Sequence, residues 1–292
     1  MEASTLKPNE VAVYFVRAGI AKHNDRLDAV FFKAVLAGVM LSFGGLLSEV
    51  LAGGSPALNT SNPGLVKILA GLVFPAGLVM IVLQGQELLT SNMMVFPMAV
   101  LKRAIPWWSL PLNWLIVTFG NLVGSLFFGA LLVKYSGILS AAPYNSYVTS
   151  FAVHKAVEPA WHQIFLRGIG CNWLVCIAVW MAAGARETVS KVIVIYIPIF
   201  LFVACSFDHV VANMFSIPLG IMFDAPGLTV AGYIRKSFIA SYIGNIVGAL
   251  LVALPSVYFH LWDYDVDGLR NAEAGVVEKR DASSENMDVK TK

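Results

Sequence analysis

The chain has 292 residues, of which 58% are hydrophobic and only 13% are charged, and its mean hydropathy is +0.72. The charged share is about half that of an average soluble domain, so the composition excludes a soluble globular protein and indicates an integral membrane protein. A formal net charge of +2 without a basic stripe excludes a nucleic-acid partner.

Residues 1–28 mix acidic and basic side chains and lack the apolar core and cleavage site of a signal peptide. Residues 8–24 predict a helix along the membrane interface or, equally, a short cytoplasmic helix that packs on neighbouring chains. The residues from 261 to 292 are charged and small, and predict a disordered cytoplasmic tail. Between them, six apolar stretches are long enough to cross a bilayer. They lie near residues 29–51, 65–101, 109–134, 164–184, 191–223 and 237–260.

Two short sequences occur twice along the chain. Residues 87–94 read ELLTSNMM and residues 208–215 read DHVVANMF, each an acid followed five residues later by Asn-Met. Similarly, residues 120–126 read GNLVGSL and residues 244–250 read GNIVGAL. The chain is therefore predicted to be a duplication, with repeats over about 29–134 and 164–260. The second and fifth stretches are too long for one crossing, and we predict that both are broken at the acid-to-Asn-Met segments.

The number of crossings sets the orientation. Three crossings in each repeat force the second copy to be inverted, and the fold class is therefore all-α, with six transmembrane helices in two inverted three-helix repeats. An even total places both termini on one side, which the positive-inside rule makes cytoplasmic. The basic pairs Lys102-Arg103 and Lys279-Arg280 agree, whereas Arg235-Lys236 gives the contrary signal.

Polar residues at membrane depth are costly and usually mark a permeation route. His209 is the one histidine of five placed well inside a stretch, beside Asp208 and at a predicted break. Its imidazole gains or loses a proton near neutral pH, and a helix break exposes N–H groups that attract an anion. Asn213, four residues on, is predicted to lie near His209. Three further asparagines, for which interhelical hydrogen bonding is the alternative role, are Asn121, Asn172 and Asn245.

Redox and metal chemistry have little support. The three cysteines, predicted to be buried structural thiols, show no metal-ligand spacing, and no metal site is expected. A membrane-embedded haem enzyme needs paired histidine ligands at similar depth, and only His209 qualifies. We therefore expect no enzyme activity and no cofactor.

Three motifs in order resemble the formate/nitrite transporter family. Residues 207–215, FDHVVANMF, resemble its Phe-acid-His-x-x-Ala-Asn-Met motif, and residues 85–92, GQELLTSN, resemble its Gly-x-acid-Leu-x-Thr-x-Asn loop. Residues 171–176, CNWLVC, resemble its fourth-helix signature. The resemblance covers about residues 29–260. Trp107-Trp108 and the N-terminal length are most similar to the fungal nitrite transporters.

The resemblance implies an aquaporin-like bundle, assembled as a homopentamer with one pore in each protomer. By the resemblance, His209 is the central histidine, Thr90 the loop threonine, and Lys155 the vestibule lysine, while Glu87 replaces the more frequent Asp. Its apolar constrictions carry over to Phe74, Leu78, Leu88, Leu89 and Phe202. The function implied is transport of a small monovalent weak-acid anion across the plasma membrane, most favourably nitrite with a proton. The alternative is a formate or short-monocarboxylate channel, and a neutral-solute channel lacks its Asn-Pro-Ala loops.

Overall fold

The structure is a computed structural model that describes residues 5–264, and this part of the chain is helical with no β-sheet. The first group of helices comprises α1 (Pro8–Asn24), α2 (Leu27–Gly53), α3 (Pro56–Ser61), α4 (Pro63–Val73), α5 (Ala76–Leu83), α6 (Leu89–Leu101), α7 (Ser109–Phe127) and the π-helix η1 (Phe128–Tyr135). The second comprises α8 (Tyr144–Ala156), α9 (Trp161–Gly184), α10 (Thr188–Ala204), α11 (Val210–Met222), α12 (Val230–Gly232), the π-helix η2 (Tyr233–Phe238) and α13 (Ile239–Leu261).

Five continuous helical segments within residues 5–264 are long and apolar enough to cross a membrane. They are Leu27–Gly53, Pro63–Leu83, Ser109–Tyr135, Trp161–Gly184 and Val230–Leu261. The predicted stretch 191–223 is instead divided into α10 and α11, each shorter than a full crossing. The protein is an integral membrane protein whose helices are not all complete spans.

Both interrupted stretches break at the repeated polar segments. Helix α5 ends before Gly85, whose positive φ of 65° is a left-handed conformation that glycine adopts without strain. Helix α10 ends before Ser206, which has a positive φ of 61° despite carrying a side chain. New helices, α6 and α11, begin directly after Leu88 and His209. The chain thus runs as extended backbone for a few residues in the middle of the molecule.

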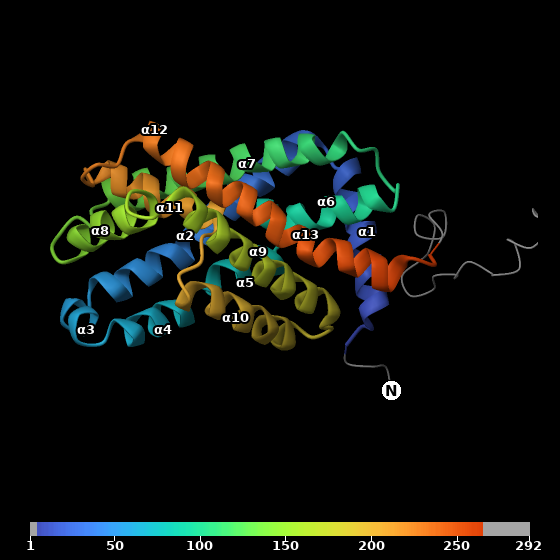
Figure 1. Cartoon of the computed structure of the whole chain (residues 1–292), viewed down its shortest axis with the longest axis horizontal. Coiled ribbons are helices and arrows are strands. Elements are labelled where there is room, and N and C mark those ends of the chain that lie inside the picture. The colour runs from blue at the N-terminus through green and yellow to red at the C-terminus, as the bar shows by residue number, and fades with distance from the viewer. Residues whose placement is uncertain (1–4, 265–292) are drawn as a thin grey trace, which may run out of the picture.

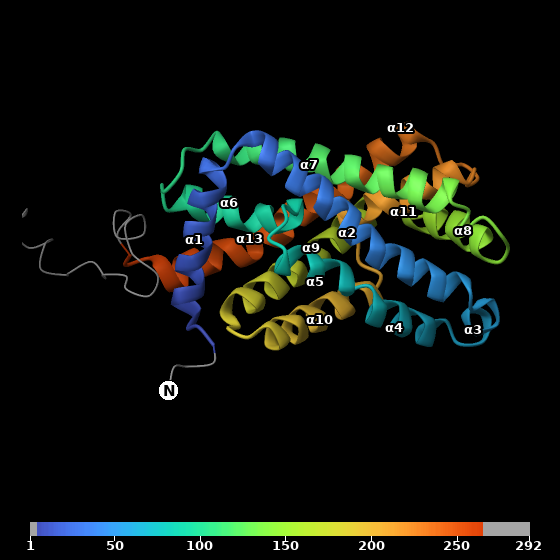
Figure 2. The same ribbon diagram turned by 180° about the vertical axis from the view of Figure 1, so that it is seen from behind.

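The long helices lie side by side along the long axis, and α1 crosses one end of the bundle (Figures 1 and 2). One side of α1 is buried, including Val11 and Phe15, and the helix packs on α6, α9 and α13. Both ends of the described chain lie at this end, where Asn9 Nδ2 donates to the Tyr264 hydroxyl at 2.7 Å. Residues 261–264, which the sequence assigns to a disordered tail, are therefore ordered, and residues 265–292 lie outside the described residues.

Two helix pairs pack with their backbones almost touching. A Cβ added at Gly124 of α7 would lie 2.0 Å from the Val35 carbonyl oxygen of α2, and one at Gly248 of α13 would lie 2.3 Å from the Ile169 carbonyl oxygen of α9. No side chain fits at either position. The small residues at a spacing of four hold each pair together and fix the distance between helices.

Candidate functional site

The break between α5 and α6 is held by one asparagine of α7. Asn121 Nδ2 donates to the carbonyl oxygens of Ala34 at 2.8 Å and Glu87 at 2.9 Å. Its Oδ1 accepts from the Leu89 N–H at 3.0 Å. A break in a helix leaves backbone groups unpaired, which is costly at membrane depth, and Asn121 supplies their partners.

The break between α10 and α11 is held in the same way from α13. Asn245 Nδ2 donates to the carbonyl oxygens of Gly168 and Asp208, both at 2.9 Å, and its Oδ1 accepts from the Val210 N–H at 2.9 Å. The two asparagines thus make matching sets of three bonds. Their predicted alternative role, bonding between helices, is combined here with holding the two loops in place.

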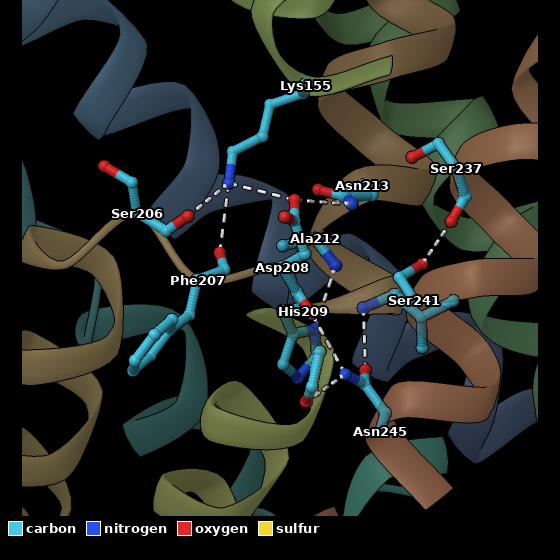
Figure 3. A network of polar contacts seen from close by, with 12 residues as sticks. Lys155, Ser206, Phe207, Asp208, His209, Ala212, Asn213, Ser237, Ser241 and Asn245 are labelled. Carbon is cyan, nitrogen blue, oxygen red and sulfur yellow. Dashed lines mark hydrogen bonds and ion pairs between the residues drawn. The ribbon is translucent and has the colours of Figure 1, made fainter. Parts of the chain in front are cut away.

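An acidic side chain in each loop is paired with a lysine from outside it. Asp208 Oδ1 lies 3.0 Å from Lys155 Nζ, and the lysine also donates to the carbonyl oxygens of Ser206 and Phe207, each at 3.0 Å (Figure 3). Asn213 Nδ2 donates to the same Asp208 oxygen at 3.4 Å. Asp208 is fully buried, so the pairing offsets the cost of a charge inside the bundle.

The other loop has an equivalent cluster that the sequence did not reveal in full. Glu87 forms an ion pair with Lys22 of α1, and Asn92 Nδ2 donates to Glu87 Oε2 at 2.7 Å. Asn92 follows Glu87 by five residues, as Asn213 follows Asp208, and this repeated spacing was visible. Lys22 was not predicted because it lies in the N-terminal segment, where no sequence repeat marks it.

His209 ends the second loop, and its side chain reaches Thr90 after the first loop and uses both ring nitrogens. Its Nδ1 accepts from the Ala212 N–H at 3.0 Å and so caps α11. A backbone N–H only donates, so Nδ1 carries no proton and the neutral ring is protonated at Nε2. Nε2 lies 3.0 Å from the Thr90 hydroxyl. Asn213 lies beside His209 as predicted, because its backbone N–H donates to the His209 carbonyl oxygen at 2.9 Å. Its side chain, however, donates to Asp208 and not to the imidazole.

Asn172 of α9 connects the two halves of the site by hydrogen bonds. Its Nδ2 donates to the carbonyl oxygens of Thr90 at 3.1 Å and Asn245 at 2.8 Å. The predicted residues His209, Thr90, Asn172 and Asn245 thus form one connected group, to which Asn121 contributes only through the loop that it holds.

Two cavities enter the bundle from opposite ends. The cavity near α3 and α8, here called the distal cavity, has a volume of 530 Å³ and reaches Phe74, Phe202 and His209. The cavity beside α1, here called the proximal cavity, has a volume of 640 Å³ and reaches Leu88.

The five side chains predicted to form the apolar constrictions are all buried. The Phe74 and Phe202 rings meet edge to face with centroids 5.7 Å apart, and Phe202 stacks on the His209 ring at the same centroid distance. Leu78, Leu88 and Leu89 are all buried. Phe202 thus contacts the His209 ring, and Leu88 and Leu89 directly precede Thr90 in the chain.

Within the described residues, no group of three His, Cys, Asp or Glu side chains could hold a metal ion. Cys171 and Cys176 are buried as predicted, but Cys205 is exposed and lines the distal cavity. The difference arises because Cys205 is the C-cap of α10, where the chain leaves the helix and turns into the loop.

Solved structures identify the class of protein. A pentameric formate channel with formate bound matches with a TM-score of 0.71 and 28% identity, covering 80% of this chain and 98% of that chain. An ion channel of the FNT family matches with a TM-score of 0.74 and 28% identity, covering 86% of this chain and 97% of that one. The fold is that of a helical membrane transport protein.

Sequence relatives identify the family. A family model described as formate/nitrite transporter matches residues 9–258. A probable formate transporter of Methanothermobacter thermautotrophicus is 38% identical and covers 89% of this chain and 99% of the relative. The formate channel BtFdhC of Bacillus thuringiensis is 39% identical and covers 83% of this chain and 90% of that protein. The chain belongs to the formate/nitrite transporter family, whose members are transporters and channels and not enzymes.

Proposed function

We propose that the protein carries small monovalent anions of weak acids, formate or nitrite, across the membrane together with a proton. The observation that carries this proposal is the hydrogen-bonded pair of His209 and Thr90, placed among apolar side chains between two cavities. A route with a polar centre and apolar walls favours a solute that is charged in water and neutral at the midpoint.

The cavity walls favour anions. The distal cavity is lined by the basic side chains of Lys67, Lys155 and Arg167. The proximal cavity is lined by four more, those of Arg17, Lys22, Lys33 and Lys191, against the two acids Asp25 and Glu87. A cleft lined mainly by one sign of charge raises the local concentration of ions of the opposite sign.

The apolar constrictions oppose the same anion further in. A bare charge at the bilayer centre costs about 2.5–3.5 kcal/mol on insertion scales, and more in simulations of an isolated helix. A weak acid avoids most of this cost when it takes up a proton before it passes Phe74 and Phe202. The anion of a strong acid has no such option, so selectivity follows from proton affinity as well as from size.

In this scheme His209 stays neutral and does not itself transfer the proton, which the acid takes up from the adjoining cavity. A proton placed on Nδ1 would break the hydrogen bond from the Ala212 N–H, so the geometry favours an uncharged ring over an imidazolium donor. Its Nε2–H and the Thr90 hydroxyl then offer the passing acid a donor and an acceptor at the midpoint.

The architecture supports an inverted duplication. The matching bonds of Asn121 and Asn245 favour two inverted repeats over about 29–134 and 164–260, with six crossings in total. We place residues 1–28 and 261–292 on the cytoplasmic side of the plasma membrane. The solved relative is described as pentameric, which favours a homopentamer here as well.

The names of two sequence relatives indicate which anion should be tested first. Two relatives with 38% and 39% identity are described as a probable formate transporter and a formate channel. These descriptions favour formate as the first anion to test, with nitrite beside it.

The test is isotope flux into proteoliposomes containing the purified protein. We expect formate and nitrite uptake to rise as the external pH falls and to weaken when the proton gradient is collapsed. Nitrate is similar in size to nitrite but stays ionised at these pH values, so it should permeate poorly. Nitrate flux equal to that of nitrite, or uptake that ignores pH, would refute the coupling and leave a simple anion channel.

A further inference from the structure

Glu49 is a buried carboxyl group that the pathway described above does not use. It lies on α2, four residues before the helix ends at Gly53, and it is 3% exposed. Neither of its carboxyl oxygens has a hydrogen-bond partner. Ser216 of α11 is nearby but forms no hydrogen bond of ordinary geometry with it. Glu49 also contributes to the wall of the distal cavity.

The surroundings of Glu49 disfavour its ionised form. An ionised carboxylate loses its hydration on burial, and no N–H or O–H group replaces the lost hydrogen bonds. The last turn of a helix carries a partial negative charge, which adds repulsion at this position. The protonated, neutral carboxyl is therefore the form that this site accommodates at the lower free energy.

The charges around Glu49 are mostly positive. Basic side chains reach the distal cavity from three other elements, as Lys67 of α4, His154 and Lys155 of α8, and Arg167 of α9. Glu49 is the only acidic side chain that lines this cavity within residues 5–264. An ionised Glu49 would therefore compete with an incoming anion for the same cations.

The cavity wall has three other titratable side chains besides the acid and the basic groups named above. They are Tyr147, Cys205 and His209. Helices α3, α5, α7 and α11, which also pack on α2, contain no titratable side chain, and Lys134 of η1 lies over the Phe223 ring. Glu49 is thus the acidic group whose protonation changes the charge of the cavity.

We propose that Glu49 is a proton-binding site of the distal cavity, coupled to anion binding there, so that the cavity takes up an anion and a proton together. This inference rests on the proposed function, because it assigns a regulator to the same anion pathway. When a proton from the adjacent solution forms an O–H bond with Glu49, the carboxylate charge disappears and no ionised acid remains in the wall of this cavity. When that bond breaks, the proton returns to water and the carboxylate repels the anion.

The coupling has a defined sign and limit. Because linkage is reciprocal, a bound anion must raise the proton affinity of Glu49 by the same factor by which the proton raises anion affinity. Anion binding should therefore be tight at low pH and weaken as Glu49 ionises. One proton per anion sets a limit of tenfold in apparent affinity for each pH unit.

The test compares Glu49→Gln with wild type and with a matched control. Glutamine keeps the size of the side chain and cannot ionise. The control, Asp224→Asn, removes an exposed acid that does not line the cavity, and asparagine tolerates the positive φ of 58° at this position. The KM for formate uptake is measured across a pH series in oriented proteoliposomes with the distal cavity facing the formate. Glu49→Leu serves as a second variant if the glutamine protein does not assemble.

We expect the wild-type KM to rise up to tenfold for each pH unit above the pH at which Glu49 ionises, and the Asp224→Asn curve to follow it. The Glu49 variants should lack this rise while kcat keeps the pH dependence that comes from the substrate acid. A KM curve of Glu49→Gln that coincides with wild type would overturn the proposal.

A second measurement separates this inference from the proposed function. Formate is added to solubilised protein in weak buffer, and proton uptake is recorded with a pH electrode. Uptake in wild type that Glu49→Gln lacks supports the coupling even if the liposomes show no flux. Equal proton uptake in both proteins refutes the coupling even where formate flux is normal.

Discussion

At the residue scale, the functional centre depends on which nitrogen of His209 holds the proton. The Ala212 N–H occupies Nδ1, and the Thr90 hydroxyl is within reach of Nε2. A side chain that can accept the hydrogen bond capping α11 and donate one to Thr90 should therefore retain part of the function of His209. Asparagine is a preferred N-cap residue and carries both a carbonyl oxygen and an amide donor.

We therefore predict that His209→Asn keeps pH-dependent formate uptake at a reduced rate, whereas His209→Phe loses it. Phenylalanine also removes the cap of α11, at a cost of about 1 kcal/mol in stability. The measurement is uptake over a pH series together with the melting temperature of each solubilised variant. Equal loss in both variants, with both well assembled, would instead make His209 a titrating proton donor.

At the scale of the elements, each helix break depends on one asparagine that makes three hydrogen bonds. We predict that Asn121→Ala and Asn245→Ala destabilise the protein by similar amounts. Hydrogen bonds inside membrane proteins average about 0.6 kcal/mol each, so the loss of three bonds costs about 2 kcal/mol. Thermal unfolding of the solubilised oligomer and formate flux both report the effect.

The matched control for these variants is Asn145→Ala. The Asn145 side chain accepts hydrogen bonds from its sequence neighbour Ser146, so we expect its replacement to change neither quantity. If one of the two central asparagines tolerates alanine and the other does not, the two matching sets of bonds do not contribute equally to stability, and the prediction is wrong.

The sequence predicted these elements unevenly. The repeated acid, Asn-Met and Gly-Asn segments located both breaks and the asparagines, because intramembrane polar residues are rare enough to stand out. Lys22 was missed because its partner Glu87 is 65 residues away and no local pattern links them. The bond of Asn213 to Asp208 was also missed. The chain turns just before Asp208 through a left-handed backbone at Ser206, a conformation that a glycine in the sequence would have indicated.

At the scale of the whole molecule, basic cavities at both ends should make anion capture depend on salt. Raising ionic strength from about 10 mM to about 150 mM shortens the Debye length from about 30 Å to about 8 Å. We predict that a non-permeant salt lowers formate uptake several-fold at low formate concentration and leaves the saturated rate unchanged. Initial rates in proteoliposomes measure both regimes.

The comparison variant carries Lys67→Gln and Arg167→Gln, two changes in the wall of the distal cavity. We expect its uptake from the distal side to be slower at low salt and less sensitive to added salt. The same salt response in variant and wild type would contradict electrostatic capture by this cavity.

The bond from Asn172 to the Thr90 carbonyl has a consequence for biosynthesis. Its donor is encoded 82 residues after its acceptor. At a translation rate of about 5–20 residues per second, Asn172 is synthesised about 4–16 seconds after Thr90. During that time the nascent first half has an interrupted helix whose central polar groups lack their final partners. We therefore expect the insertion machinery or bound water to supply hydrogen-bond partners to these groups until the second half of the chain has been synthesised.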